Sequence, residues 1–150
     1  MHSISFIPQN EFTLWNDLWQ KYLKFYQASL PDAVTNVTWE RIMDPAEDIY
    51  CFGGYWTADG AKELVGFTNF LYHSSTWSEQ GYCYLEDLYV EEKFRGKGVG
   101  KLLIESVWDH CLRKGVKRLY WKTQDKNKIA RIMYDKVAKQ SGFIEYEIET

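Results

Sequence analysis

The first stretch that could do chemistry is the glycine-rich hexapeptide RGKGVG, which runs from Arg95 to Gly100. Its glycines let the backbone turn several N–H groups toward one point, and they place no Cβ in the way of a ligand. A helix that begins at Val99 would add its free N–H groups and the positive end of its dipole. This combination predicts a site for a polyanion, most simply a pyrophosphate.

Three phosphate-binding patterns compete for this hexapeptide. The P-loop pattern needs four residues between its glycines, and only three separate Gly96 from Gly100. The dinucleotide-binding pattern needs a third glycine where Lys101 stands. The pattern Arg/Gln-x-x-Gly-x-Gly/Ala after a strand is matched in order by Arg95, Gly98 and Gly100. A plain glycine-rich connection between a strand and a helix is the remaining alternative.

A strand and a helix are expected on either side of the hexapeptide. Tyr82–Val90 is aromatic and β-branched, which is typical of a half-buried strand. From Val99 onward, apolar residues recur at three- and four-residue steps as far as Cys111, which predicts one buried face of a helix. Gly115, preceded by basic residues, marks the end of that helix.

The rest of the chain supplies further elements. Ile49–Trp56 and Leu64–Tyr72 form a predicted hairpin around a polar turn, and Tyr82–Val90 extends it into an antiparallel meander. The other expected strands are Ile4–Pro8, Arg118–Lys122 and Phe143–Ile148, and the other expected helices are Glu11 to about Ser29, Thr38–Met43 and Asn127–Val137.

Length and composition narrow the class of protein. A chain of 150 residues is expected to form one domain, residues 1–150. The net charge of −3 argues against a nucleic-acid partner. No apolar run approaches the ~18 residues of a membrane helix and no apolar leader is evident, so we expect no membrane partner and a cytoplasmic protein. The three cysteines suggest neither disulfides nor a zinc site, and the three histidines match no metal-ligand spacing.

With its flanking strand and helix, the hexapeptide resembles the phosphate-binding loop of the GNAT superfamily of acetyl-CoA-dependent N-acetyltransferases. The order of expected elements is also similar to that of the superfamily, so the resemblance covers essentially the whole chain. It implies an α/β (α+β) fold in which a mixed, mostly antiparallel sheet of about six strands is flanked by helices. It also implies acetyl-CoA as the cofactor. The family commonly ends with two strands, and there is room here for one.

The sequence LEDLYV at Leu85–Val90, the hexapeptide, and Asn127 followed by Tyr134 look like the spermidine/spermine (diamine) acetyltransferases and the related fungal-type histone and polyamine acetyltransferases. The resemblance implies that Glu86 is the base, that Asp87 binds the substrate and that Tyr134 is the acid. It implies that coenzyme A is held by Leu88, Tyr89 and Val90 along the pantetheine arm, by Arg95, Gly96, Lys97, Gly98, Val99, Gly100 and Lys101 at the pyrophosphate, and by Asn127, Lys128, Ile129 and Ala130 on its other side.

Each role has a simpler alternative. Glu86 and Asp87 are adjacent, so on a regular strand they point to opposite faces, and only a β-bulge would bring them together. Tyr134 by itself is more often a core residue. Tyr26 and Trp77 are further candidates for the substrate side, with Trp77 either a core anchor or a cation–π wall for an ammonium group.

Together, these expectations predict that the protein transfers an acetyl group to a primary amine, most simply of a small cationic polyamine or diamine. An alkyl ammonium has a pKa near ~10.4, so a carboxylate must remove its proton before attack on the thioester. A backbone N–H near Val90 would stabilise the oxyanion. The alternatives are an amino acid, an aminoglycoside-like amine or a protein amine, and a non-catalytic acyl-CoA-binding module. A homodimer is expected, because Phe143–Ile148 lacks a closing strand.

Overall fold

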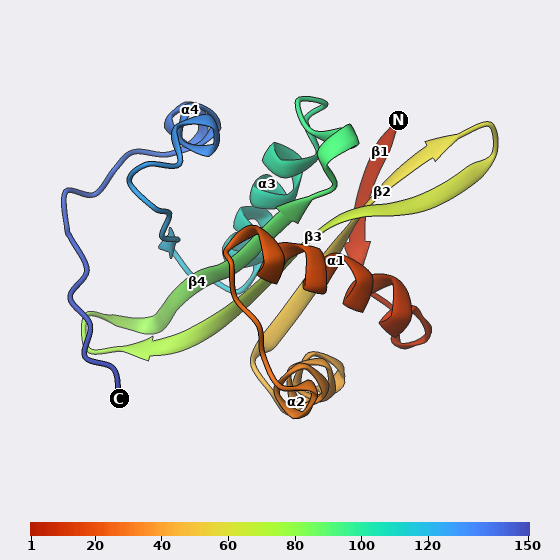
Figure 1. Ribbon diagram of the computed structural model, residues 1–150. Coiled ribbons are helices and arrows are strands. Elements are labelled where there is room, and N and C mark those ends of the chain that lie inside the picture. The colour runs from red at the N-terminus through yellow and green to blue at the C-terminus, as the bar shows by residue number, and fades with distance from the viewer.

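The computed structural model describes the whole chain, Met1–Thr150, as one sheet with helices on both faces (Figure 1). The strands are β1 (His2–Phe6), β2 (Ile49–Ala58), β3 (Ala61–Ser75), β4 (Ser78–Val90) and β5 (Leu119–Tyr120), and the helices are α1 (Phe12–Phe25), α2 (Asp32–Met43), α3 (Val99–Arg113) and α4 (Lys128–Val137), with 3-10 turns η1 (Gln9–Glu11) and η2 (Glu92–Phe94). The strand order is β1-β2-β3-β4-β5, and only β4 and β5 are parallel. The mixed, mostly antiparallel sheet is confirmed, with five strands in place of about six.

Two apolar cores lie on opposite faces of this sheet. α3 covers one face with the stripe that its sequence predicts, which includes Val99, Leu103, Val107 and Cys111. On the other face, α1 and α2 pack around a group of aromatic side chains that includes the fully buried Trp15. Because β3 and β4 carry side chains of both cores, they form the middle of the molecule and are held on both sides.

Two hairpins build the meander that was expected. The β2–β3 turn is made by Asp59 and Gly60, whose φ angles of 51° and 76° suit a tight two-residue turn. The β3–β4 turn lies at Trp77, because both strands run further than their sequences predicted. All three cysteines are free and buried. None of the helices combines the length and the apolar character that a membrane crossing requires.

Several predicted boundaries differ from the structure. α2 begins at Asp32 rather than at Thr38, because Pro31 is the N-cap of α2 instead of merely ending α1. β5 is shorter than the predicted strand Arg118–Lys122.

The predicted last strand, Phe143–Ile148, is wrong. The chain after α4 runs along the β4 side of the sheet without regular structure (Figure 1). The strand at this edge of the sheet, β5, spans only Leu119–Tyr120 and offers little backbone to pair with. Ile144, Tyr146 and Ile148 are therefore 75%, 88% and 102% exposed.

Candidate active site

The glycine-rich hexapeptide forms a cluster of free backbone donors at the start of α3. Beginning with Gly96, six successive N–H groups, through Lys101, donate to no backbone carbonyl; the next, that of Leu102, donates to Gly98 O at 3.0 Å. Gly98 caps the helix with a φ of 88°, and no side chain caps its first turn. These donors and the helix dipole together favour a bound anion with several oxygens.

The glycines leave room for such a ligand. Gly96 has a φ of 76°, and a Cβ added there would meet no atom within 4 Å. Both the left-handed backbone and the open space above it fit a pyrophosphate that approaches the main chain closely. The loop therefore suits the diphosphate of coenzyme A on two independent grounds, its donors and its shape.

β4 offers a free edge close to these donors. The N–H of Glu91 donates to Val65 O at 2.8 Å, so Gly66 and Val90 form a non-hydrogen-bonded pair of the antiparallel ladder. The N–H and C=O of Val90 therefore point away from β3. The carbonyl accepts a hydrogen bond from Arg95 Nε at 2.8 Å. Since β5 pairs with β4 only further back along the strand, the N–H of Val90 remains available to a ligand.

Three elements converge at this edge. Around Gly100, the Met133 methyl group lies 3.3 Å and Val90 Cγ2 lies 3.7 Å from the place of an added Cβ. The absence of a side chain at Gly100 thus lets α4 approach both the first turn of α3 and the end of β4. The next residue of α4, Tyr134, packs edge-on against Trp121 with a ring-centroid distance of 5.5 Å.

The other predicted coenzyme A ligands on α4 lie at its N-terminus. Asn127 precedes the helix, and its Nδ2 donates to Thr123 Oγ1 at 3.4 Å. The side chain of Ile129 is 86% exposed. In the first turn of α4, the N–H of Lys128 donates to Lys126 O at 2.8 Å, whereas those of Ile129 and Ala130 donate to no backbone carbonyl. This turn therefore presents two free backbone donors and an uncovered apolar side chain at the same end of the sheet as Val90.

A β-bulge brings the two carboxylates to one face of β4. Asn69 pairs with Asp87, whereas the next residue of β3 pairs with Leu85, so Glu86 has no partner. Leu85 and Leu88 both belong to the α3 side of the sheet, although they are three residues apart. Glu86 and Asp87 between them therefore both face the α1 side. This is the rearrangement that a regular strand would not allow.

The two carboxylates differ in their surroundings. Glu86 is exposed, whereas Asp87 lies beneath α1 and its Oδ2 accepts a hydrogen bond from Asn69 Nδ2 at 3.0 Å. Burial raises the pKa of Asp87 to about 6, although hydrogen bonds from Asn69 and Tyr22 lower it, and the charge of Glu86 raises it further. Asp87 is thus ionised at neutral pH but holds a proton more tightly than an ordinary aspartate.

Tyrosines surround these carboxylates. Tyr22 and Tyr26 of α1 contact each other edge-on, at 5.1 Å between ring centroids, and burial followed by the charge of Asp87 raises the pKa of both. Burial, and secondarily Tyr26, raises the pKa of Tyr134 to about 12. Tyr26 and Tyr134, predicted from distant parts of the sequence, are therefore brought to the same site.

One candidate is not brought there. Trp77 lies at the β3–β4 turn with 88% of its surface exposed, so it is not a core anchor. Ten residues of extended strand separate it from Asp87, which corresponds to roughly 30 Å.

Sequence reasoning missed two residues of the site, Asn69 and Tyr22. Asn69 is only 5% exposed, and its Oδ1 has no hydrogen-bond partner. A polar residue inside the apolar strand segment 64–72 was the signal that could have revealed it. Tyr22 lies within the helix that the sequence predicts from Glu11 to about Ser29, but its contact with Asp87 depends on the bulge.

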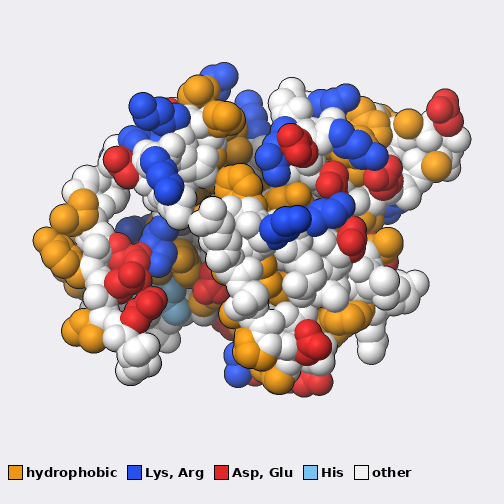
Figure 2. Space-filling view, in the orientation of Figure 1, with side chains coloured by type: hydrophobic (Ala, Val, Ile, Leu, Met, Phe, Trp, Pro, Cys, Tyr) orange, Lys and Arg blue, Asp and Glu red, His pale blue; other side chains and the backbone are white.

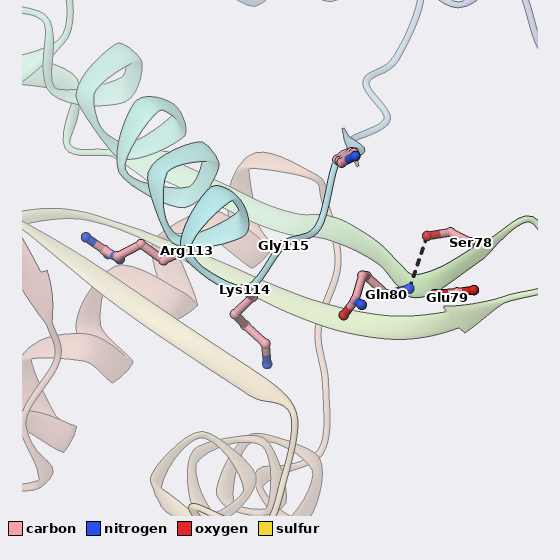
Figure 3. A pocket seen from close by; sticks show the side chains of 7 residues that line it. Ser78, Glu79, Gln80, Arg113, Lys114 and Gly115 are labelled. Atoms are coloured by element: carbon pink, nitrogen blue, oxygen red, sulfur yellow. Dashed lines mark hydrogen bonds between the residues drawn. The ribbon is translucent and has the colours of Figure 1, made fainter.

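Figure 2 shows a hollow between the C-terminal segment and the body of the sheet, with acidic and basic side chains gathered along it. Another depression lies at the far end of α3, between residues 113–117 and the β4 residues 78–80 (Figure 3). It contains no hydrophobic residue and is separated from the glycine-rich loop by the length of α3, about 22 Å. This depression is therefore separate from the glycine-rich loop.

Known proteins with similar sequences agree with this geometry. Residues 13–138 match the acetyltransferase (GNAT) family. The chain is 34% identical over 140 residues to the D-amino-acid N-acetyltransferase HPA3 of Saccharomyces cerevisiae, which covers 93% of this chain and 85% of the yeast protein. It is 33% identical over 93 residues to the thialysine N-epsilon-acetyltransferase of Caenorhabditis elegans, covering 59% of this chain and 58% of that protein.

Solved structures show the same fold. A ribosomal-protein-alanine N-acetyltransferase from Brucella melitensis biovar Abortus 2308 has a TM-score of 0.79 at 19% identity and covers 100% of this chain and 99% of its own. The aminoglycoside acetyltransferase AAC(6')-Iy, in complex with a coenzyme A bisubstrate analogue, has a TM-score of 0.82 at 19% identity, with the same coverage. The chain belongs to the acetyltransferase (GNAT) family and is an acetyl-CoA-dependent N-acetyltransferase.

Proposed function

We propose that the protein acetylates a primary amine of a small cationic acceptor, and that Asp87, Glu86, Val90 and Tyr134 carry the reaction. The observation that carries this proposal is the β-bulge, which sets two carboxylates on one face of β4 immediately before its free edge. Two negative charges on one face attract an ammonium group. The resemblance to diamine acetyltransferases makes a polyamine or diamine the first candidate acceptor.

Asp87 is the better candidate for the base, and Glu86 for the residue that attracts the ammonium group. The acceptor needs a proton removed from a group with a pKa near ~10.4, and a base is most effective when its own pKa approaches the working pH. The pKa of Asp87, raised to about 6 by burial, meets this requirement. This assignment reverses the roles that the resemblance implied for the two carboxylates.

Asn69 supports the placement of the amine. Its Nδ2 holds Asp87, while its Oδ1 is buried without a partner in the chain. A buried acceptor without a hydrogen bond destabilises a fold by about 1–3 kcal/mol unless a ligand supplies the donor. The N–H groups of an amine beside Asp87 would supply it.

Bound acetyl-CoA supplies an activated thioester for the transfer. The N–H of Val90, which the β3 ladder leaves free, is the donor that we assign to the oxyanion. Tyr134 is protonated at neutral pH, because burial raises its pKa to about 12, and it can therefore donate a proton to the departing thiolate. The cysteines are 0–2% exposed, so we infer direct transfer without an acetylated cysteine.

An amino acid is the second candidate acceptor, because the yeast relative is named for D-amino acids. An aminoglycoside-like amine and a protein amine are further alternatives. The test is release of coenzyme A thiol from acetyl-CoA in the presence of polyamines, diamines, amino acids, aminoglycosides and a histone-tail peptide. Turnover with at least one small amine is expected, and its absence with every small amine would refute the proposal.

We also propose a homodimer, formed through the C-terminal segment. The apolar side chains of Ile144, Tyr146 and Ile148 are exposed, and they alternate with the acidic residues 145, 147 and 149. An alternating apolar segment without a partner strand seldom stays in water. A second copy of the chain would cover this face.

A further inference from the structure

Lys122 lies near a β4 residue that precedes the two carboxylates. β4 and β5 are parallel with Tyr84 opposite Tyr120, and Glu86 and Lys122 each follow two residues later in the chain. The rings of Tyr84 and Tyr120 stack at 5.0 Å between centroids. β5 ends at Tyr120, whereas β4 continues to Val90, so β4 has no strand beside it from Glu86 onward on this edge.

Tyr84 lies near charged groups of both signs. The Nζ of Lys122 lies 5.7 Å from the centroid of the Tyr84 ring. Burial raises the pKa of Tyr84, Lys122 opposes this rise, and the charges of Glu86 and Asp87 add to it. Tyr84 is therefore close enough to Lys122 on one hand, and to Glu86 and Asp87 on the other, for charges of both signs to act on it.

Lys122 is held by the C-terminal segment. Its ammonium group contacts the carboxylate of Glu145, and both side chains are about half exposed, at 56% and 46%. Exposed ion pairs contribute about 0–1 kcal/mol, and no ladder hydrogen bonds secure the segment that carries Glu145. A carboxylate from solution could therefore replace that of Glu145 at little cost.

We infer that the acceptor carries a carboxylate as well as its amine, and that Lys122 binds this carboxylate in the position that Glu145 occupies in the free protein. This inference rests on the proposed function, and it places an amino acid ahead of a polyamine or diamine as the acceptor. A diamine would gain nothing from Lys122, since its second ammonium group would be repelled. An amino acid places its ammonium group at Asp87 and Glu86 and its carboxylate at Lys122, and so pairs charges of both signs.

Lysine and cadaverine provide a matched pair of acceptors, because cadaverine is lysine without its carboxylate. We expect the wild-type protein to have a higher kcat/KM for D- or L-lysine than for cadaverine. Lys122→Met should lower the ratio of these two values by about tenfold or more, the size expected for a lost hydrogen bond between charged groups. Glu145→Gln should raise kcat/KM for lysine, because the competing carboxylate is gone. Lys117→Met, an exposed lysine outside the hollow, is the control and should leave the ratio as in the wild type.

Calorimetry with lysine and coenzyme A measures the same preference without turnover, and lysine should bind more weakly to Lys122→Met than to the control. If Lys122→Met lowered kcat/KM equally for lysine and for cadaverine, Lys122 would have a structural role only, and the inference would be overturned. Preference of the wild-type protein for cadaverine would overturn it as well, while leaving the proposed function intact. Transfer to no amine at all would refute the proposed function, and this inference with it.

Discussion

Asp87→Asn should inactivate the protein and stabilise it at the same time. Asparagine keeps the shape of the side chain and removes both the charge and the proton acceptor, so kcat/KM should fall by about 10²-fold or more. The pKa of Asp87 is about 6 in the folded protein, against an ordinary value of 3.8. That difference corresponds to about 3 kcal/mol of folding free energy.

The sign of the effect follows from the raised pKa. The folded protein binds the Asp87 proton more tightly than the unfolded chain does. The contribution of this proton to the free energy of unfolding is therefore complete below pH 3.8 and is lost as the pH rises through about 6. Asp87→Asn does not undergo this loss. Its advantage in free energy of unfolding over the wild type should therefore grow by about 1.4 kcal/mol between pH 5 and pH 8.

Urea unfolding, followed by the fluorescence of the tryptophans at pH 5 and pH 8, measures this difference. Glu86→Gln is the matched control, because Glu86 is exposed, and its stability should stay within about 0.5 kcal/mol of the wild type at both values of pH. An advantage of Asp87→Asn that did not change with pH would show that Asp87 is not a desolvated carboxylate. The assignment of Asp87 as the base would then lose its physical ground.

Three further predictions concern the cofactor, the acid and the partner. Gly96→Ala should weaken coenzyme A binding, measured by calorimetry, by about tenfold or more. Gly60→Ala is the control, because Gly60 has the same φ of 76° and equally open space. It should share the backbone strain of roughly 1–2 kcal/mol but keep the coenzyme A affinity of the wild type. Tyr134→Phe should lower kcat by about 10²-fold with little change in coenzyme A affinity. The wild-type protein should sediment as a dimer at tens of micromolar, and Tyr146→Glu should sediment as a monomer.

Each of these predictions has a contrary outcome. Equal coenzyme A affinity in the two glycine variants would show that the hexapeptide does not bind the pyrophosphate. A loss confined to KM in Tyr134→Phe would mean that the hydroxyl binds the acceptor and donates no proton. A monomeric wild-type protein would show that the C-terminal segment does not form a dimer interface.

The central part of the fold was predictable because its signals are local. The step from Tyr82–Val90 through the glycines to α3 depends on strand composition, on glycine conformations and on helical periodicity, all of which are carried by neighbouring residues. The hairpin strands β2 and β3 were placed to within a few residues for the same reason.

The errors arose where a distant segment decides the outcome. Phe143–Ile148 alternates like a strand, but a strand needs a partner, and the edge strand β5 has only two residues. The bulge at Glu86 is set by pairing with Asn69 on β3, which no pattern within β4 reveals. For this reason the sequence identified the two carboxylates but could not tell which of them is buried.

A crystal structure with coenzyme A and an acceptor amine tests the central claim most directly. It should show the pyrophosphate on the N–H groups of Gly96–Lys101, the pantetheine arm along the free edge at Val90, and the sulfur within about 4 Å of the Tyr134 hydroxyl. The acceptor nitrogen should lie within hydrogen-bonding distance of Asp87. Coenzyme A bound elsewhere, or an acceptor nitrogen remote from both carboxylates, would contradict the account.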